Sequence, residues 1–507
     1  MTGVVLDSTQ SCSATDDASP PFAVGAVSAV AALAGVVAAL SATRYGYYYD
    51  ELYFIAAGKR PSFSYADQGP VLPLLAWSMD WLFSGSFAAL RIPSIVAALV
   101  VVIFGAATAR ELSGGRGAQV LTATACSTSF YLLGQAGTLS TNSIDTALWV
   151  VLTWLLVRWV RTRRDVLLLV AGLVTAVDMQ VKWLVPVFWV AVFVAVAWLG
   201  PRELLRRPAL WWGAGFVVVA TAPAVVWQAR HGWPQLGMGA VVRGQTNGFS
   251  GSLMFVPAAA QMCGILGGVL LVYGAWRLCR SPRLRPYRFL GVAFLLVVAV
   301  FAISGGRIGY GVGAYVAMMA AGAVELTALG KRWLVFAAVP TVVLSVLAFV
   351  VLTTPWRPAS ELTPASNFAV AVASPVYGEF GWAELTSATV DAYRALPVDQ
   401  RSAAVIVTDR YIQASALDHS RSGAGLPAVF SPHRGFGYFG TPPDTAVTVL
   451  WVGGDESKLR TLFSSVAPAA KSDVRVGIPG ITTDVTIWEC NGPTLPWSAM
   501  WPSLRQL

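Results

Sequence analysis

Long apolar stretches separated by short polar breaks fill most of the chain between residues 22 and 354. About eleven of them reach roughly 16 residues or more, close to the length with which a helix crosses a lipid bilayer. They lie at residues 22–43, 87–109, 118–136, 143–160, 166–182, 184–200, 209–229, 252–276, 288–304, 311–328 and 332–354. The pattern predicts a polytopic α-helical membrane protein with about eleven transmembrane helices over residues 22–354.

One further apolar stretch, VLPLLAWSMDWLFSG at residues 71–85, is short and contains Pro73 and Asp80. We expect it to form a helix on the membrane surface, because it is too short to span the bilayer easily. If it crossed instead, residues 44–70 would lie on the other side of the membrane. Counting charges leaves both arrangements open.

After residue 354 the pattern becomes that of a soluble domain. We expect a helix at 382–396, strands at 403–409 and 445–454, an aspartate-capped helix at 455–466 and a strand at 483–490. Alternating strands and helices are typical of an α/β domain. The sequence therefore predicts a small C-terminal α/β domain at 355–507.

Composition and charge add a location. The 507 residues are 56% hydrophobic and only 12% charged, with a formal net charge of +9, far from the composition of soluble proteins. Lys and Arg cluster in alternate loops, which by the positive-inside rule face the cytoplasm of a plasma membrane, as does the disordered tail predicted at 1–21. The first outer loop (44–86), the second long outer loop (230–251) and the C-terminal domain are then extracytoplasmic. Nucleic-acid binding is not needed to explain the charge.

The first outer loop begins with RYGYYYDELYFIAAGKRPSFSYADQGP (44–70), which places Asp50 and Glu51 side by side. An acidic pair is often only a solvated loop start, and Asp145 could be only a favourable charge at a helix N-terminus. Tyrosines around the pair and the nearby bilayer edge favour a site instead. We therefore take Asp50, Glu51 and Asp145 as catalytic candidates. The candidates for lining the substrate are Tyr49, Tyr53, Asp67, Gln68, His231 and Tyr310.

Three outward cations are candidates for binding a phosphate: Lys182, Arg243 and Arg307. Lys182 lies four residues after Asp178 and could simply neutralise it, and the two arginines could equally anchor to lipid headgroups. Five cysteines and three histidines without paired spacing predict no metal site. We predict no cofactor, and the sequence gives no support for a divalent cation such as Mg²⁺ or Mn²⁺.

Several segments, in this order, resemble a known family. After the Asp50–Glu51 pair come YADQGPVLPLLA (65–76), LRIPSIVAAL (90–99), LSTNSIDTALW (139–149), a lysine between two spans, and HGWP (231–234). As an ordered set over most of 22–354 they resemble the GT-C glycosyltransferases related to protein O-mannosyltransferases and lipid A aminoarabinose transferases. GEFGW, RGFGYFG and PWSAMWPSLRQL, within 375–507, look like the soluble tail of actinobacterial members.

The resemblance implies an inverting glycosyltransferase that takes a sugar, with mannose a fair analogy, from a polyprenyl-phosphate carrier outside the plasma membrane. Asp50 would be the base and Asp145 a second acidic residue. The family's paired prolines are Gly69 and Pro70 here, and Gln68 stands where aminoarabinose transferases have a lysine. The phosphate contact would then come from Lys182, Arg243 or Arg307, unless the carrier is held differently.

Other functions remain open at this point. A polytopic transporter or lipid-linked sugar flippase is the main alternative, although the polar residues gather at one face and no inverted repeat is visible. A non-catalytic receptor would need only one span. The expected partners are a polyprenyl-phosphate-linked sugar, membrane lipids and a hydroxyl acceptor, which could be a protein, a glycolipid or a cell-wall glycan.

Overall fold

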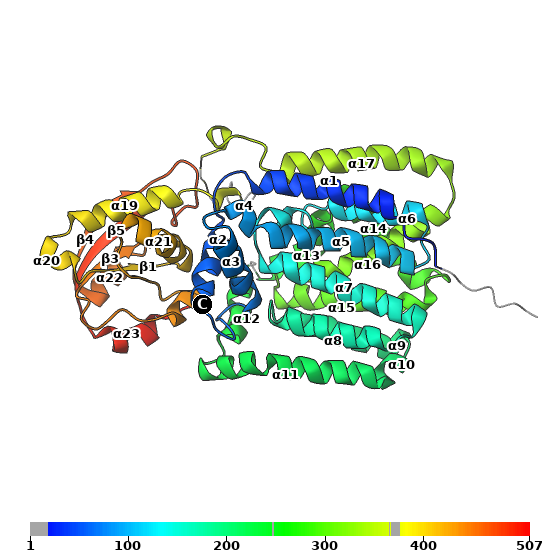
Figure 1. Ribbon diagram of the computed structural model, residues 1–507, viewed down its shortest axis with the longest axis horizontal. Helices are drawn as coiled ribbons and strands as arrows, with labels where there is room; N and C mark the ends of the chain where they lie inside the picture. The colour runs from blue at the N-terminus through cyan, green and yellow to red at the C-terminus, as the bar shows by residue number, and fades with distance from the viewer. Residues whose placement is uncertain (1–18, 246–247, 365, 367–375) are drawn as a thin grey trace, which may run out of the picture.

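The computed structural model describes residues 19–507 except 246–247, 365 and 367–375. The predicted disordered tail lies almost entirely outside the described residues. A bundle of helices occupies one half of the molecule and a small sheet domain the other (Figure 1). The main bundle helices are α1 (Val24–Ala42), α5 (Ile92–Glu111), α6 (Arg116–Ser127), α7 (Thr141–Thr162), α8 (Val166–Met179), α9 (Val185–Leu199), α11 (Pro208–Arg230), α14 (Gly264–Arg280), α15 (Arg288–Ser304), α16 (Val312–Ala328) and α17 (Arg332–Thr353).

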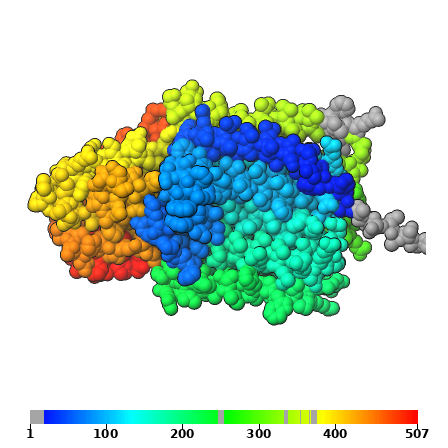
Figure 2. Space-filling view, in the orientation of Figure 1, coloured from blue at the N-terminus to red at the C-terminus, as the bar shows by residue number. Residues whose placement is uncertain are grey.

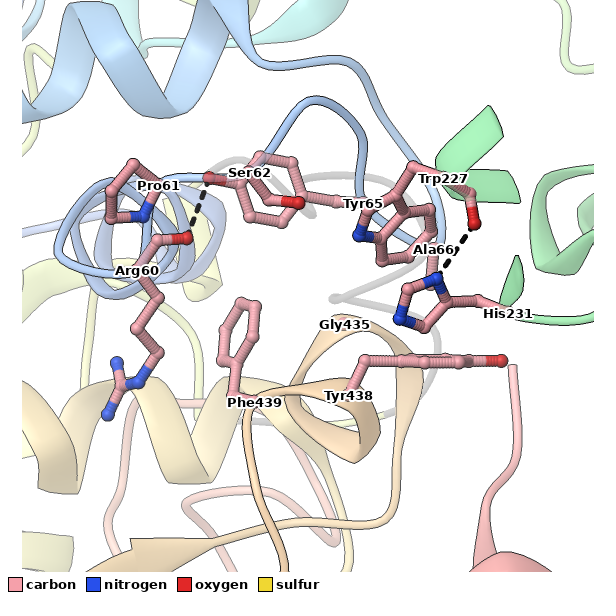
Figure 3. Close-up of a pocket in the computed structure, with 10 residues that line it drawn as sticks. All are labelled: Arg60, Pro61, Ser62, Tyr65, Ala66, Trp227, His231, Gly435, Tyr438 and Phe439. Atoms are coloured by element: carbon pink, nitrogen blue, oxygen red, sulfur yellow. Dashed lines mark hydrogen bonds between the residues drawn. The ribbon is translucent and has the colours of Figure 1, made fainter. Parts of the chain in front are cut away.

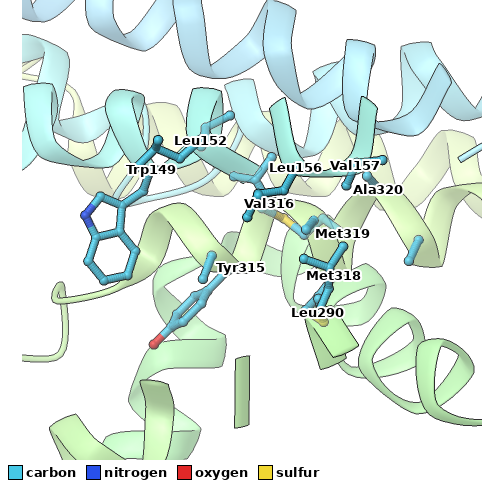
Figure 4. Packing of buried hydrophobic residues seen from close by; sticks show 14 of the residues in the cluster. Trp149, Leu152, Leu156, Val157, Leu290, Tyr315, Val316, Met318, Met319 and Ala320 are labelled. Atoms are coloured by element: carbon cyan, nitrogen blue, oxygen red, sulfur yellow. The ribbon is translucent and has the colours of Figure 1, made fainter. Parts of the chain in front are cut away.

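The helices α7 and α16 form the centre of the bundle. Trp149 and Leu156 of α7 pack against Tyr315 and Met319 of α16, and all four side chains are at most 1% exposed (Figure 4). Apolar side chains on the outer helices remain largely exposed, for example Trp212 and Val219 on α11. These four side chains form an apolar contact between the two central helices. The exposed apolar surface of the outer helices is typical of a membrane protein.

The structure confirms the helical membrane class but not the count of eleven spans. Within the described residues, five helices are long and apolar enough to cross a membrane, or six if one bent pair counts as a span. Others are short: α8 has 14 residues and α9 has 15. At about 1.5 Å per residue, such helices fall short of a hydrocarbon layer of about 30 Å.

Two predicted spans differ from the structure at a helix break. The stretch 252–276 is divided between α13 (Gly248–Met262) and α14. The helix axis bends by 120° at the break between them. The stretch 118–136 is helical only to Ser127, followed by a turn and the short helix η1 (Gly134–Gly137). The Met262 carbonyl freed by the break accepts hydrogen bonds from the Tyr131 amide (3.0 Å) and the Ser129 hydroxyl (2.9 Å). Each irregular segment therefore satisfies the backbone of the other.

Short helices lie between the bundle and the sheet domain: α2 (Tyr49–Gly58), α3 (Val71–Leu82), α4 (Phe87–Leu90) and α12 (Pro234–Gln245) (Figure 1). Leu74, Trp77 and Trp81 of α3 are exposed, as expected of a helix at a membrane surface. Both α2 and α3 stay at the end of the bundle that faces the sheet domain. Residues 44–70 therefore lie at that end, as the surface arrangement of 71–85 requires.

Basic residues gather at the opposite end of the bundle. There the buried Glu111 carboxylate pairs with Arg161 (2.6 Å) and Arg158 (3.5 Å), and Glu203 of the short helix α10 (Glu203–Arg206) pairs with Arg163 (3.2 Å). These pairs place Arg158, Arg161 and Arg163 of one predicted basic loop at that end, and the side of the membrane on which the basic loops lie stays a prediction.

The C-terminal domain contains a five-stranded sheet of order β2-β1-β3-β5-β4. The strand β1 is parallel to β2 and β3, whereas β5 is antiparallel to β3 and β4. The strands are β1 (Val405–Thr408), β2 (Val429–Phe430), β3 (Thr448–Val452), β4 (Phe463–Ser472) and β5 (Val485–Pro493). The helices of this domain are α19 (Trp382–Ala395), α20 (Val398–Arg401), α21 (Tyr411–Ala424), α22 (Glu456–Leu462) and α23 (Trp497–Leu504). The 3₁₀ turn η4 (Arg434–Tyr438) lies between β2 and β3, η3 (Ala359–Glu361) precedes α19, and η2 (Arg285–Tyr287) precedes α15 in the bundle.

The predicted α/β class of this domain is confirmed, and Asp455 caps α22 by accepting from the Ser457 amide at 2.8 Å. The helix predicted at 455–466 is too long, because it ends at Leu462 and Phe463 begins β4. Figure 2 shows this domain packed directly on the first-loop segment. Arg60, just after α2, binds Asp418 of α21 through two hydrogen bonds of 3.0 and 3.1 Å.

Candidate active site

Asp50 lies in the first turn of α2, where the chain turns back from α1 toward the sheet domain. Its carboxylate accepts a hydrogen bond of 2.7 Å from the hydroxyl of Tyr411, the first residue of α21. Burial raises the pKa of Asp50, and the Tyr411 hydrogen bond and the charges of Arg434, Arg307 and Lys182 oppose that rise. Asp50 is thus a desolvated carboxylate that accepts a hydrogen bond from a hydroxyl group. It also lies close enough to three cations to feel their charge.

Arg434, at the start of η4, joins Asp50 to a second carboxylate. Its guanidinium is 3.2 Å from the Tyr411 hydroxyl and 3.8 Å from the Asp67 carboxylate. The Tyr53 hydroxyl donates to Asp67 at 2.8 Å, and burial raises the pKa of Asp67 against the opposing charge of Arg434. We call Asp50, Tyr53, Asp67, Tyr411 and Arg434 the Asp50 cluster.

The sequence did not identify Tyr411 or Arg434 as site residues. Both come from the C-terminal domain, and Tyr411 is 361 residues from its partner Asp50. The only signal was the aromatic segment RGFGYFG, which begins at Arg434. The first outer loop and the C-terminal domain therefore build the cluster together.

Lys182 lies on the bundle side of the site. Its ammonium is 2.6 Å from the Asn142 side-chain oxygen and 4.1 Å from the centre of the Tyr310 ring. The same ammonium acts on the charges of Asp145 and Asp50. The structure thus brings Lys182, Tyr310 and Asp145 together, and Lys182 is within electrostatic reach of Asp50.

The two candidate arginines differ in their placement. Arg307 donates to the side chain of Gln245 at 2.8 Å and acts on both Asp50 and Tyr49, so it belongs to the surroundings of the site. Arg243 is exposed on α12, two residues before Gln245.

The departure at Gly69 has a steric cause. A Cβ atom on Gly69 would collide with the backbone of Gln180. The Gly69 amide donates to Val181 (3.3 Å) and the Val71 amide to Gln180 (3.1 Å), so this loop runs directly against the segment that ends in Lys182. Gln68, 2% exposed, is buried in the same contact. Lys182, the residue after Val181, is therefore close to the Gln68–Gly69 segment.

Glu51 points away from the Asp50 cluster. Its carboxylate binds Arg91 at 2.9 Å and accepts from the amides of Leu139 and Tyr48, both at 2.8 Å. Glu51 is 0% and Arg91 1% exposed. The same guanidinium reaches Glu379 at 3.2 Å, and burial raises the pKa of Glu379 to about 8 although Arg91 opposes the rise. With these partners, Glu51 connects α2, α5 and the C-terminal segment.

His231 also lies outside the cluster. Its ring stacks on Trp227 at 4.0 Å and lines a separate cavity, beside Tyr438 (Figure 3). Among the residues that the structure describes, no three His, Cys, Asp or Glu side chains are grouped so that they could hold a metal ion.

Comparison with known proteins gives the class. Residues 67–227 match the family model "Dolichyl-phosphate-mannose-protein mannosyltransferase". The structure is similar to that of ArnT from Cupriavidus metallidurans in the apo state, with a TM-score of 0.58, 16% sequence identity, and coverage of 92% of this chain and 98% of that one. ArnT from the same organism bound to undecaprenyl phosphate gives a TM-score of 0.57 at 16% identity and the same coverage. By sequence search, no curated protein matches.

The chain is therefore a polytopic membrane protein with the GT-C fold. Its residues 67–227 resemble the mannosyltransferase family, and its structure as a whole resembles that of ArnT. The matched segment includes Asp67, Arg91, Asp145 and Lys182, whereas Asp50, Tyr411 and Arg434 lie outside it.

Proposed function

We propose that this chain is an inverting glycosyltransferase that moves a sugar from a polyprenyl-phosphate carrier to an acceptor hydroxyl, with Asp50 as the base. The observation that carries the proposal is the 2.7 Å hydrogen bond from the Tyr411 hydroxyl to the half-buried Asp50 carboxylate. A general base needs this distance to the hydroxyl proton that it removes. The ArnT structure with bound undecaprenyl phosphate supports the carrier class, and the mannosyltransferase family model supports mannose as the sugar.

In the proposed step the acceptor O–H gives its proton to Asp50. The acceptor oxygen forms a bond to the anomeric carbon, and the bond from that carbon to the phosphate oxygen breaks on the opposite face. The polyprenyl phosphate leaves with the electron pair. Lys182 and Arg307 stabilise its developing negative charge, which replaces protonation by an acid. The side-chain oxygen of Asn142, 2.6 Å from the Lys182 ammonium, positions that ammonium, and Asp145 interacts with it electrostatically.

Glu51 has a positioning role in this proposal, because its carboxylate is fully engaged by Arg91 and by two backbone amides. The basic end of the bundle would face the cytoplasm. The Asp50 cluster and the C-terminal domain would then lie outside the plasma membrane, where the carrier's phosphosugar meets a water-borne or lipid-borne acceptor.

The direct test uses the purified full chain in proteoliposomes with mannosyl, arabinosyl and galactosyl polyprenyl phosphates and a membrane extract as acceptor. We expect release of polyprenyl phosphate together with a new glycosidic product of inverted anomeric configuration. Movement of intact donor across the bilayer without such a product would instead favour the flippase.

The variant Tyr411→Phe should move the acidic limb of the pH profile of kcat/KM to higher pH. The Tyr411 hydroxyl stabilises the charged form of Asp50 and so lowers its pKa. Without it the pKa of Asp50 rises, and the base becomes active only at higher pH. Tyr393→Phe is the matched control, since that hydroxyl donates to the Arg401 carbonyl in the same domain. An unchanged limb would remove Asp50 from the role of titrating base.

The variant Lys182→Met should weaken binding of the carrier phosphate roughly 10- to 100-fold, because a hydrogen bond to a charged group contributes about 1.5–3 kcal/mol. Lys182→Arg keeps the charge and should lose less. Titration of polyprenyl phosphate against the protein in nanodiscs, without donor sugar, measures both. Equal affinity in the wild type and Lys182→Met would assign the phosphate to other cations.

A further inference from the structure

A cavity of about 260 Å³ lies between the first outer loop, the end of α11 and the turn η4 (Figure 3). Two motifs of the sequence meet here that the Asp50 cluster does not use. One is HGWP, which begins at His231, and the other is the aromatic part of RGFGYFG, with Tyr438 and Phe439. Three distant parts of the chain therefore cooperate to form one cavity.

The walls of the cavity are aromatic. The His231 ring stacks on Trp227 at 4.0 Å and 15°, and Tyr438 stands at a steep angle to His231 with ring centres 5.9 Å apart. On the other side, Tyr65 and Phe439 meet edge to face at 6.1 Å. Rigid aromatic faces with a few polar groups between them are typical of small-ligand sites, and such faces pack well against the C–H face of a sugar ring.

The polar groups at the cavity are uncharged or, in the case of Arg60, neutralised by a carboxylate. His231 binds the Trp227 carbonyl through Nδ1 (2.7 Å), and its other ring nitrogen faces the cavity (Figure 3). Tyr65 donates to the Arg60 carbonyl at 3.0 Å. Arg60 is the only Arg, Lys, Asp or Glu among the lining residues. Its guanidinium is paired with Asp418 and lies 5.3 Å from the centre of the Phe439 ring. This environment suits hydroxyl groups better than a phosphate or carboxylate.

The cavity borders the Asp50 cluster at Tyr53. Gly435 lines the cavity, and a Cβ atom there would collide with the Tyr53 hydroxyl. The Tyr53 ring in turn lies 4.9 Å from the Tyr411 ring. The residue before Gly435 is Arg434, so a single turn contributes to both the cavity and the cluster.

From these contacts we infer that the cavity is a carbohydrate-binding site, which holds a neutral sugar ring of the acceptor next to the hydroxyl that Asp50 activates. The assignment to the acceptor rests on the proposed function, whereas the binding of a neutral sugar rests on the cavity alone. The same ring chemistry could belong to a soluble glycan or to the headgroup of a glycolipid.

The test is ligand-observed saturation-transfer NMR on the full chain in lipid nanodiscs, without donor. The probes are di- to tetrasaccharides of mannose, arabinose and galactose, and in a second arm a mannosylated lipid placed in the nanodisc. We expect at least one probe to receive saturation from aromatic protons. Trp227→Leu and Tyr438→Ala should weaken its binding at least about tenfold, Tyr438→Phe should keep it, and Trp356→Leu, an exposed tryptophan elsewhere, should leave it unchanged. Binding of the lipid alone would identify a glycolipid acceptor.

No saturation of any probe, or saturation equal in the wild type and in folded Trp227→Leu and Tyr438→Ala, would overturn the inference. The variant Asp50→Asn separates it from the proposed function, because Asp50 does not line the cavity. Sugar binding with full transfer activity in Asp50→Asn would refute the base and keep the cavity. Loss of transfer in Asp50→Asn without any sugar binding by the wild type would do the reverse.

Discussion

The variant Asp50→Asn should lower kcat for sugar transfer about 10²- to 10⁴-fold, the usual contribution of a general base. Asparagine has nearly the same shape but cannot take the acceptor proton. Transfer from a polyprenyl-phosphate sugar by purified protein in proteoliposomes measures the effect. Carrier binding should change little, since Lys182 and Arg307 remain.

A matched control for this variant is Asp80→Asn on the neighbouring helix α3. It removes a carboxylate from the same outer loop but not from the Asp50 cluster, so transfer should stay near the wild-type rate. Equal, near-complete activity of both variants would show that Asp50 is not the base.

The second large effect is on stability. Replacing Arg91 with methionine should destabilise the protein by about 3–5 kcal/mol, because Glu51 would be left as a buried charge without its partner. Thermal unfolding in detergent, followed by near-ultraviolet circular dichroism, should show a clear fall in the transition temperature.

The double variant Glu51→Gln/Arg91→Met distinguishes the ion pair from simple packing. With both charges gone, much of the lost stability should return. A double variant that is less stable than Arg91→Met alone would mean that the backbone contacts of Glu51 with Leu139 and Tyr48 dominate. Arg158→Met, at the opposite end of the bundle and one of several partners of Glu111, is the control with a small expected loss.

The sequence predicted those features that depend on local patterns. The long apolar stretches located most helices of the bundle. Short runs typical of strands located β1, β3 and β5. The break between α13 and α14 could not be seen, because Gly264 is one of several glycines in an apolar run. Its positive φ of 74° and its close approach to the Thr128 carbonyl are features of the folded chain and leave no mark in the sequence pattern.

The site was predicted from one side only. Asp50 stands in a recognisable segment of the first outer loop, and Lys182 and Tyr310 stand in segments of the bundle; the structure places all three around one region. Tyr411 and Arg434 reach it through the docking of a separate domain, which no spacing along the chain encodes. Adjacency alone could not show that Glu51 and Asp50 differ in role. Glu51 binds Arg91, 40 residues away, whereas Asp50 binds Tyr411, 361 residues away.

The hydroxyl of Tyr411 also affects how well the donor sugar is protected from hydrolysis. In the structure this hydroxyl donates a hydrogen bond to one carboxylate oxygen of Asp50. On the proposed function, water competes with the acceptor. If Asp50 were freely accessible to water, it would promote hydrolysis of the donor sugar. The acceptor hydroxyl must displace the Tyr411 hydroxyl from Asp50. A sugar acceptor gains binding energy for this displacement from the aromatic cavity beside the cluster, whereas a water molecule does not.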